Sequence, residues 1–464
     1  MQESRGAASI RLEGRLTRAD RERDPYAYPA FEVPAGIAAI RISLDHEPRG
    51  SADDPGRGAV LDLGLIGPGS LKFGAPSFRG WSGSERRSVI IGATRATPGY
   101  RPGPIEAGTW HVILGLYAIP PGGCTYRLDI DLLSAEPARA EPAAAGVTPE
   151  RQSGADRWIP CDLHAHTVHS DGADDIATVA GLAVQAGLEV LFVTDHNTDS
   201  HHPELVVAGR AAGIELLPGE EVTTYGGHFN ALGIDAWVDF RHASPGQVRR
   251  AIDAIHAQAG LASINHPAST GSPWTHGPDL PFDLVEVWNG PWRDENERAL
   301  AWWTELIETG RRVTAVGGSD MHSSARRDQP VGTPLTWVRA VGTGRAAIVE
   351  GLRAGRVIVA RDRSIGLPRL SVVDAAGTSH EVGSSVELGG PLEVRWEAAG
   401  HADHELRLLS RLGSIQIVEL APDRLAGSLR LDPAERAAAG YVRLELRAAG
   451  ELLALTNPIY LEAI

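Results

Sequence analysis

Hydrophobic and polar positions divide the chain into three segments. Up to about residue 155, apolar and polar side chains alternate along short stretches such as residues 38–44 and 126–132, and Gly- and Pro-rich stretches separate them. An alternation with a period of two is typical of half-buried β-strands. Residues 1–155 are therefore predicted to form a β-sandwich-like domain, and the Ala-, Pro- and Glu-rich residues 136–149 to be a linker.

The pattern changes over residues 156–365, where short apolar runs alternate with stretches of helical period. The apolar runs predict strands at Cys161–Thr167, Val190–Asp195, Ile214–Pro218, Phe229–Ile234, Leu261–Asn265, Leu284–Trp288 and Val313–Gly317. The stretches of helical period predict helices at Asp174–Ala186, Pro203–Ala212, Pro245–Gln258 and Glu295–Thr309. Strands that alternate with helices favour a parallel sheet, and about seven strands predict a distorted (β/α)7 barrel.

The last segment, residues 366–464, returns to the alternation of half-buried strands. Residues 392–396 and 441–446 are its cleanest examples. They predict a small second β-sandwich-like domain. The predicted fold class is thus α/β, with a distorted (β/α)7 barrel flanked by an N-terminal and a C-terminal β-sandwich-like domain.

Composition and charge limit what the chain can bind. With 464 residues, of which 42% are hydrophobic and 22% charged, it is long enough for about two to four domains. The formal net charge of −15 argues against general binding of nucleic acid, which needs a basic surface. No apolar stretch approaches the roughly 20 residues of a membrane span, and no secretory signal is visible at the N-terminus, so the expected location is the cytoplasm.

Two residue types exclude particular mechanisms. Lys72 is the only lysine among 44 basic residues, so the chain has neither a phosphate-binding loop with its lysine nor a Schiff-base lysine in the middle segment. The two cysteines, Cys124 and Cys161, cannot make a disulfide framework.

The middle segment concentrates the candidate chemistry, because twelve of the 17 histidines lie between His164 and His322. They stand with carboxylates in short motifs: Asp162-Leu163-His164-Ala165-His166, Ser170-Asp171-Gly172, Thr194-Asp195-His196, Pro218-Gly219-Glu220-Glu221, His228, Asn265-His266-Pro267 and Ser319-Asp320-Met321-His322. Imidazoles and carboxylates are ligands of zinc, manganese and iron, and these are too many for one tetrahedral site. Most of them follow a predicted strand end, where α/β barrels carry their chemistry. The pattern predicts two or three divalent transition-metal ions that serve hydrolysis.

The order of these motifs resembles the PHP (polymerase and histidinol phosphatase) superfamily over roughly residues 158–330. The preceding segment, with Gly80-Trp81-Ser82-Gly83 and Gly108-Thr109-Trp110-His111, resembles the amino-terminal part of the carbaryl-hydrolase-like branch. The superfamily resemblance implies a distorted seven-stranded (β/α) barrel with two or three metals. It also implies hydrolysis of phosphoesters or, in a few members, of carbamates, amides or esters.

The resemblance assigns metal ligands position by position. The first metal would be held by His164, His166, Glu221 and Asp320, the second by Glu221, His228 and His266, and the third by Asp171, His196 and His322. Glu221 would bridge two metals. If this segment is extended, Glu220 points the opposite way. The middle segment is therefore expected to contain every metal ligand.

Further residues are expected near the metals. His164 and His166 stand at i and i+2 and share a face if the strand is extended. Asp162 on the same face is expected to orient an imidazole, and Asp195 to support His196 in a similar way. Arg293, Arg326 and His201 follow strand ends and are candidate substrate-binding residues. Surface solvation would explain the arginines equally well, and a place at the rim of the site is the favoured alternative for His201. Asp320, as base or proton shuttle, and His322 are the candidate catalytic residues.

The predicted function is a metal-dependent hydrolase of a small molecule, first of all a phosphoesterase. In such a site a metal-bridging hydroxide attacks phosphorus or a carbonyl carbon. Two alternatives stay open: a carbamate or carboxylic-ester hydrolase at the same centre, and a binding module with a vestigial barrel. The substrate, the identity of the metal and the oligomeric state stay open as well.

Overall fold

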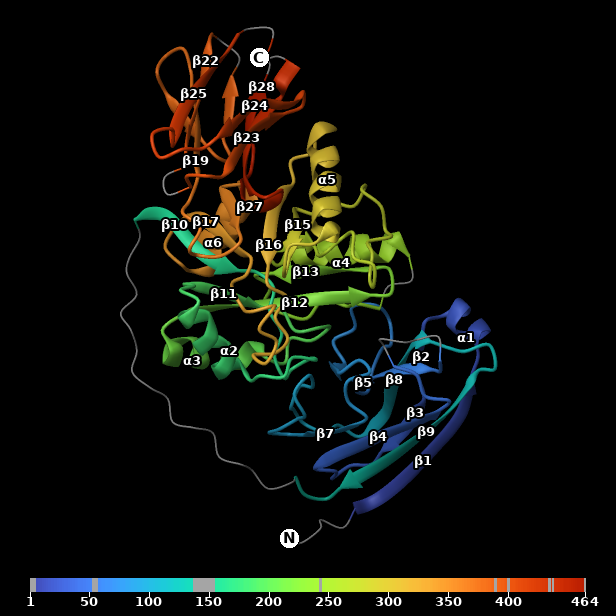
Figure 1. Cartoon of the computed structure of the whole chain (residues 1–464). Helices are drawn as coiled ribbons and strands as arrows, with labels where there is room; N and C mark the ends of the chain where they lie inside the picture. Colours follow the sequence, from blue (N-terminus) through green and yellow to red (C-terminus); the bar gives the residue numbers. More distant parts are fainter. Residues whose placement is uncertain are drawn as a thin grey trace.

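A computed structural model of the chain describes residues 6–51, 57–136, 155–241, 244–387, 390–398, 401–432, 435 and 438–462. The predicted linker at 136–149 lies outside these residues except for Glu136. Figure 1 shows a central region with a β-rich region at each end, the N-terminal one in blue and the C-terminal one in orange and red. Six helices accompany many strands in the described residues, so the chain is mostly β, and strands alternate with helices in the central region.

The N-terminal region consists of two sheets that share one core. One sheet has the order β1-β9-β4-β7, and the other has the order β2-β8-β5-β6, with β3 paired to β8. The elements are β1 (Gly6–Leu16), α1 (Arg18–Arg23), β2 (Tyr26–Ala27), β3 (Ala30–Val33), β4 (Ala39–Glu47), β5 (Val60–Ile66), β6 (Phe78–Trp81), β7 (Ser88–Gly92), β8 (Gly108–Ala118) and β9 (Cys124–Leu133). Alternate side chains of both sheets, such as Ile40, Leu63 and Leu128, are buried between them. This is the sandwich that the alternation of residues predicts.

The central region is a curved sheet with strand order β16-β15-β14-β13-β12-β11-β10. Its elements are β10 (Asp156–Asp162), α2 (Ile176–Gln185), β11 (Val190–Val193), α3 (His202–Ala212), β12 (Glu215–Thr224), β13 (Gly227–Leu232), α4 (Pro245–Ala257), β14 (Leu261–Ile264), β15 (Leu284–Asn289), α5 (Asp294–Glu308) and β16 (Thr314–Gly318). Strands β10 to β12 are parallel to one another, as are β14 to β16. Strand β13 is antiparallel to both its neighbours, because a tight turn at Tyr225–Gly226 joins it directly to β12.

The strand ladders do not close this sheet, so the predicted (β/α)7 barrel is not confirmed. Strand β17 (Leu335–Val341) pairs antiparallel with β10 at the edge that β16 would need for closure. Only beyond the ends of β10 and β16 do the two edges meet. There the N–H of Asp320 donates to the carbonyl of His164, and the N–H of His166 donates to that of Met321, both at 2.9 Å. The sheet is therefore drawn together at the end where the candidate ligands lie.

The C-terminal region continues the central sheet. After α6 (Arg345–Arg353), β18 (Val357–Ala360) pairs with both β17 and β27 (Glu451–Thr456), and the ladder runs on through β26 (Tyr441–Ala448), β23 (Glu405–Ser410) and β24 (Gly413–Glu419). A second sheet is formed by β20 (Ser379–Glu381), β19 (Arg369–Val373), β22 (Leu392–Glu397) and β25 (Ala426–Leu431), and β21 (Ser385–Glu387) pairs with β28 (Ile459–Glu462). The boundaries near residues 155 and 365 stay our proposal for the domains.

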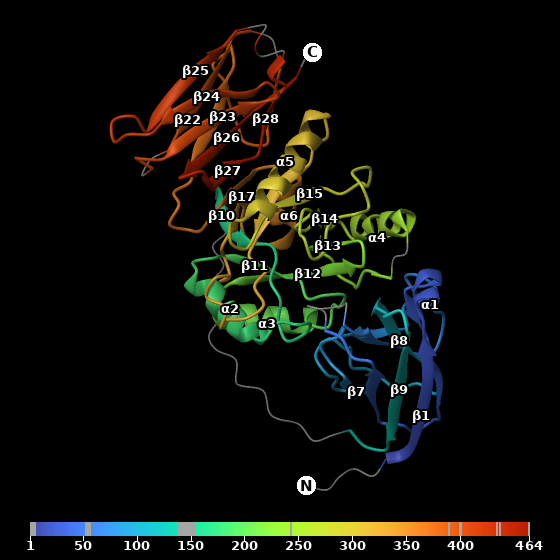
Figure 2. The ribbon, with the colours of Figure 1, turned by 45° about the vertical axis from the view of Figure 1, so that its right-hand side comes forward.

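The N-terminal region lies beside the central region (Figure 2). Aromatic side chains pack between the two regions. Phe78 stacks on Trp237 with ring centroids 3.9 Å apart, and Tyr26 stacks on Tyr225 at 5.7 Å. Arg101 adds an ion pair of 2.6 Å to Asp199. No helix within the described residues is long and apolar enough to cross a membrane.

Candidate metal centre

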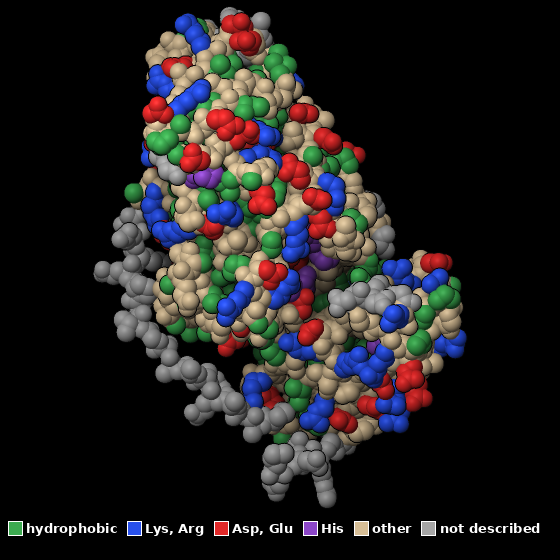
Figure 3. All heavy atoms as spheres, in the orientation of Figure 1, with side chains coloured by type: hydrophobic (Ala, Val, Ile, Leu, Met, Phe, Trp, Pro, Cys, Tyr) green, Lys and Arg blue, Asp and Glu red, His purple; other side chains and the backbone are tan. Residues whose placement is uncertain are grey.

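Nine histidine, aspartate and glutamate side chains converge at the end of the central sheet where β10 and β16 meet. They come from the segments after β10, β11, β14 and β16 and from within β12 and β13: His164, His166, Asp171, His196, Glu221, His228, His266, Asp320 and His322. All nine belong to one continuous network of imidazole–carboxylate pairs. Figure 3 shows histidine side chains in a hollow between the central and N-terminal regions.

Glu221 is the centre of the network. Its Oε2 lies 3.3 Å from Nε2 of His164 and 2.9 Å from Nδ1 of His196. Its Oε1 lies 3.2 Å from Nδ1 of His228 and 3.3 Å from Nε2 of His266. Burial alone would raise the pKa of this carboxyl, but His164, His196 and His228 hold it well below its usual range. The two oxygens of Glu221 thus face two different sets of imidazoles.

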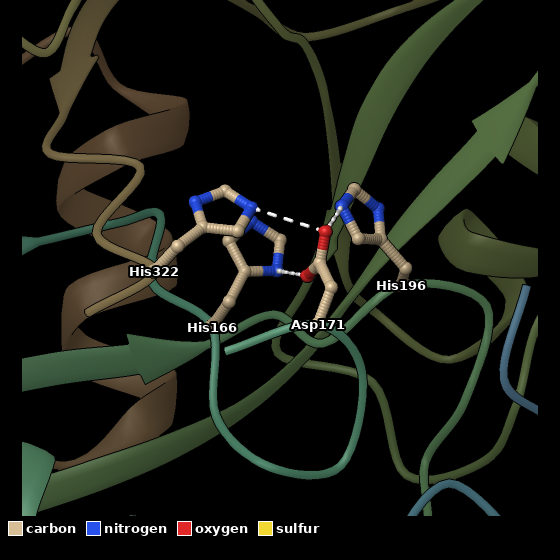
Figure 4. Close-up of side chains that lie close together, drawn as sticks. All are labelled: His166, Asp171, His196 and His322. Carbon is tan, nitrogen blue, oxygen red and sulfur yellow. Dashed lines mark ion pairs between the residues drawn. The ribbon is translucent and has the colours of Figure 1, made fainter. Parts of the chain in front are cut away.

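Asp171 faces a second group of imidazoles (Figure 4). Its Oδ2 lies 3.4 Å from Nε2 of His322 and 3.5 Å from Nε2 of His196, and its Oδ1 lies 3.9 Å from Nδ1 of His166. Nδ1 of His322 lies 2.8 Å from the carbonyl oxygen of Asp320, so it carries the proton and leaves Nε2 free for another partner.

Three overlapping groups of these side chains could each hold a metal ion, with ligand atoms within 4.8 Å of one another: His164, His166, Glu221 and Asp320; His166, Asp171, His196 and His322; and His196, Glu221 and His228. Nε2 of His164 and Oε2 of Glu221 are buried and lie 3.3 Å apart, yet neither makes a hydrogen bond in the described part of the chain. Buried polar atoms without partners are costly, and a cation between them would satisfy both. The donor set therefore fits divalent transition metals.

Sequence reasoning did not identify Glu286, which lies behind His164. One oxygen of Glu286 is 3.0 Å from Nδ1 of His164, and the other accepts the backbone N–H of His266 at 3.0 Å. A carboxylate in this position fixes the tautomer and the orientation of a ligating imidazole. The signal in the sequence was an acidic residue inside the otherwise apolar run Leu284–Trp288.

Asp162 and Asp195 orient backbone and loops instead of the imidazoles we expected. Asp162 accepts the backbone N–H groups of His164, Ser319 and Gly332 at 2.8–3.2 Å. Asp195 accepts both the N–H and the hydroxyl of Thr167, and also the hydroxyl of Ser170. The two carboxylates therefore fix the two segments that carry His164 and Asp171.

Two of the candidate ligands have left-handed backbone conformations. His266 has a φ of 30° and Asp320 a φ of 52°. Such conformations are costly for residues other than glycine and persist where the surroundings impose them, which is frequent at functional sites. The backbone of Asp320 is held by its bond to His164 and by the side chain of Gln329, which donates to its carbonyl at 2.8 Å.

Two cavities adjoin the cluster, and both are bounded by His196 and His228. The first measures about 320 Å³ and is also lined by Arg293 and Arg326, two of the candidate substrate-binding residues. The second measures about 600 Å³ and lies between the cluster and the N-terminal region. The third candidate, His201, lines neither cavity: its side chain is fully buried, with Nε2 3.1 Å from the carbonyl oxygens of Val193 and Gly219.

Comparison with known sequences finds one match over 149 residues and two matches over about 60 residues. The uncharacterized protein MJ1587 of Methanocaldococcus jannaschii is 30% identical over 149 residues, which cover 29% of this chain and 85% of that protein. A 5'-3' exoribonuclease of Haemophilus influenzae is 36% identical over 63 residues, and a phosphoribosyl 1,2-cyclic phosphate 1,2-diphosphodiesterase of Eggerthella lenta is 36% identical over 64 residues. This chain spans only 23% and 24% of those two proteins. No family model matches the sequence.

Solved structures give weaker likenesses. A two-domain protein of Bacteroides vulgatus, described as containing a predicted PHP-like metal-dependent phosphoesterase, has 17% identity and a TM-score of 0.39, and the match covers 69% of this chain and all of that protein. An amidohydrolase of Chromobacterium violaceum has 19% identity and a TM-score of 0.29, and the match covers 37% of this chain and 89% of that one.

Proposed function

The chain belongs to the same protein family as the uncharacterized protein MJ1587 of Methanocaldococcus jannaschii, and we propose that it is a metal-dependent hydrolase of the polymerase and histidinol phosphatase type that acts on a small phosphoester. The order of the ligand motifs along residues 164–322 supports this proposal, and so does their convergence in space.

The observation that carries the proposal is the placement of Glu221. Its two oxygens face separate groups of imidazoles at 2.9–3.4 Å, as a carboxylate does that bridges two cations. We assign His164, His166, Glu221 and Asp320 to one metal, Glu221, His228 and His266 to a second, and Asp171, His196 and His322 to a third. Divalent cations in such positions supply the charge that stabilises an oxyanion and acidifies water.

The side chains of the protein position the substrate and handle its protons. Arg293 and Arg326 line the smaller cavity and would bind an anionic group of the substrate, since guanidinium groups recognise phosphate oxygens in pairs. Asp320 lines the same cavity, with Oδ1 turned to His166 and His164 at 3.0 and 3.3 Å. We assign its other oxygen, Oδ2, to accept the proton that hydrolysis releases, with His322 as the second catalytic side chain.

Hydrolysis of a carbamate or carboxylic ester is the second candidate, because the larger cavity has aromatic walls instead of basic ones. The two arginines of the smaller cavity favour the phosphoester. Two relatives, an exoribonuclease and a phosphodiesterase, also act on phosphoesters by name.

The test is a substrate panel on protein of known metal content. We expect at least two transition-metal ions per chain and hydrolysis of para-nitrophenyl phosphate or of bis(para-nitrophenyl) phosphate. Protein treated with a chelator is the control and should regain activity when metal is returned. Turnover of para-nitrophenyl acetate or an aryl carbamate, with neither phosphoester cleaved, would select the second candidate. A protein that binds less than one ion after supplementation would contradict both and favour a binding module.

A further inference from the structure

The larger cavity connects the metal cluster to the N-terminal region. Asp171, His196 and His228 bound it on the cluster side. Tyr26, Trp81 and Tyr117 bound it on the other side and come from β2, β6 and β8. A volume of about 600 Å³ is in the range of small-molecule sites.

Asp62 is the unusual residue of this cavity. It lies in β5, whose seven residues are all buried and otherwise apolar or glycine, and it is itself only 7% exposed. Its Oδ2 accepts the hydroxyl of Tyr225 at 2.7 Å, across the interface between the two regions. Oδ1 has no hydrogen-bond partner within the described residues, and the carboxyl group borders the cavity. An ionised carboxylate can accept several bonds, so this one keeps acceptor capacity for a ligand.

The surrounding chain makes room for this carboxylate. A Cβ atom at Gly115 would lie 2.6 Å from Oδ2 of Asp62 and 2.5 Å from the hydroxyl of Tyr225, closer than real Cβ contacts. The rings of Tyr26 and Tyr117 pack on Tyr225 with centroids 5.7 Å away in each case. The Asp62 carboxylate therefore lies in a recess that is lined by aromatic rings, and it offers a hydrogen-bond acceptor in the wall of that recess.

If Asp62 served only to link the two regions through Tyr225, its side chain would not need to be a carboxylate. A neutral acceptor would bind the hydroxyl of Tyr225 equally well without the cost of burying an acid. The charges on the N-terminal side of the cavity point to a ligand: Asp62 and Glu85 line it there, and no lysine or arginine is among its described lining residues. Such a site disfavours anions and favours groups that donate hydrogen bonds.

We propose that the N-terminal region forms a subsite for the leaving group of the substrate, an aromatic ring that carries a cationic or neutral hydrogen-bond donor, and that Asp62 is its specificity-determining residue. This inference rests on the proposed function for the hydrolytic step. Recognition of the leaving group rests on the cavity alone, so the two can be tested separately.

The first experiment measures binding without chemistry. Saturation-transfer NMR at about pH 8 would compare para-(aminoethyl)phenol, para-ethylphenol and para-(carboxyethyl)phenol on the metal-loaded protein. We expect the amine to bind best and the carboxylate worst. Asp62→Asn keeps an oxygen for Tyr225 and should weaken the amine about tenfold, because a charge-assisted bond is lost, while para-ethylphenol changes little. Asp131→Asn, on an exposed face of β9, is the matched control.

The second experiment repeats the series with the corresponding aryl phosphates and compares kcat/KM. Loss of the preference for the amine in Asp62→Asn, with para-ethylphenyl phosphate still cleaved, supports the subsite. Equal effects of Asp62→Asn on all three phenols, or no binding of any to the wild-type protein, would overturn it. If the phenols bind as expected but no phosphate is cleaved, the proposed phosphoesterase function fails and the subsite stands. Tyr225→Phe leaves Asp62 in place and serves as the folding control. It shows whether the loss of the preference for the amine comes from impaired folding.

Discussion

The N-terminal and C-terminal β regions are attached to the central region in different ways. The N-terminal sandwich contacts it through side chains, with Phe78 on Trp237 and Tyr26 on Tyr225, and it lines a cavity beside the metal cluster. The C-terminal region is attached through the backbone, because β18 and β27 pair in one continuous sheet. It contributes no lining residue to the two cavities beside the cluster in the described part of the chain.

This difference separates two roles that a β-rich flank can have. A surface that docks through side chains can change its lining residues without altering the backbone of the neighbouring region, so it is suited to selecting substrates. A region joined by a strand ladder shares its hydrogen bonds with the central sheet and is suited to stabilising it. The following substitutions would break or sharpen this comparison.

The largest effect is expected in the cluster itself, where adjacent glutamates face opposite sides. Glu221→Gln should remove bound metal and lower kcat by about a thousandfold or more, because the carboxylate between the imidazoles is lost. Glu220→Gln should retain the metal, since Oε2 of Glu220 accepts the N–H of Val238 on the side away from the cluster. Elemental analysis and kinetics of both proteins measure the difference, and equal metal loss would show that the assignment is wrong.

A large effect on stability alone is expected in the C-terminal sheet. Glu445 is buried between Arg443 and Arg447 at 2.6 and 2.7 Å, and Arg447 reaches Glu297 of α5. Glu445→Gln should lower the free energy of unfolding by about 3–5 kcal/mol, because it leaves the buried guanidinium group of Arg443 without its carboxylate. Urea denaturation measures this loss, and the folded protein should keep its metal content and kcat. A change in kcat without a change in stability would contradict the comparison.

A pH-dependent effect is expected from Asp62. Burial raises the pKa of this carboxyl from 3.8 to about 7, and the hydroxyl of Tyr225 lowers it only in part. Between these values the folded protein keeps a proton that the unfolded chain releases, so this group makes stability fall as pH rises from about 4 to about 7. The slope is at most about 1.4 kcal/mol per pH unit. The urea midpoint of the wild type, relative to that of Asp62→Asn, should fall as the pH rises over this range. A relative midpoint that rises with pH would refute the prediction.

The smallest effect is expected from Arg86 in the N-terminal region. Its guanidinium group donates to the carbonyls of Ser170 and Val168 at 2.7 and 2.6 Å and so holds the loop that carries Asp171. Arg86→Ala should lower kcat/KM about tenfold through misplacement of this loop, with little change in stability. Arg87→Ala, at the exposed neighbouring position, is the control. Equal kinetics of the two variants would mean that the N-terminal region does not position the cluster.

Most helices and strands of the central region could be predicted because each depends on local periodicity. The strand predicted at Cys161–Thr167 was wrong in its bounds: β10 is observed at Asp156–Asp162, so His164 and His166 lie beyond its end. The predicted helix at Pro245–Gln258 is observed at Pro245–Ala257, and the predicted strand at Leu284–Trp288 at Leu284–Asn289. The closed barrel could not be predicted reliably, because closure depends on which strand takes the edge of β10. That edge is taken by β17, which lies far along the chain. The antiparallel course of β13 likewise depends on the tight turn at Tyr225–Gly226.

The candidate ligands could be proposed from the sequence because they stand in short, ordered motifs, most of them at strand ends. Their supporting residues were not, because support depends on contacts between distant segments. Glu286 lies 122 positions from His164, and Asp62 lies 163 positions from Tyr225. His201 was expected near the substrate from its place in a loop, yet its ring points into the protein, where the carbonyls of Val193 and Gly219 lie close to its Nε2.

The pairing of β18 with β27 determines where the chain can be shortened. Removal of the C-terminal region after residue 365 would expose the edge of β18, where Ile358, Val359 and Ala360 pair with β27. Such an apolar edge is a template for pairing with another molecule, so we expect this fragment to aggregate. A chain that begins near residue 155 would lose no strand pairing among the described residues. It would expose a surface with aromatic side chains, including Trp237 and Tyr225, and with charged ones such as Asp199. Solubilising substitutions on that surface would therefore give the shorter protein better suited to crystallisation.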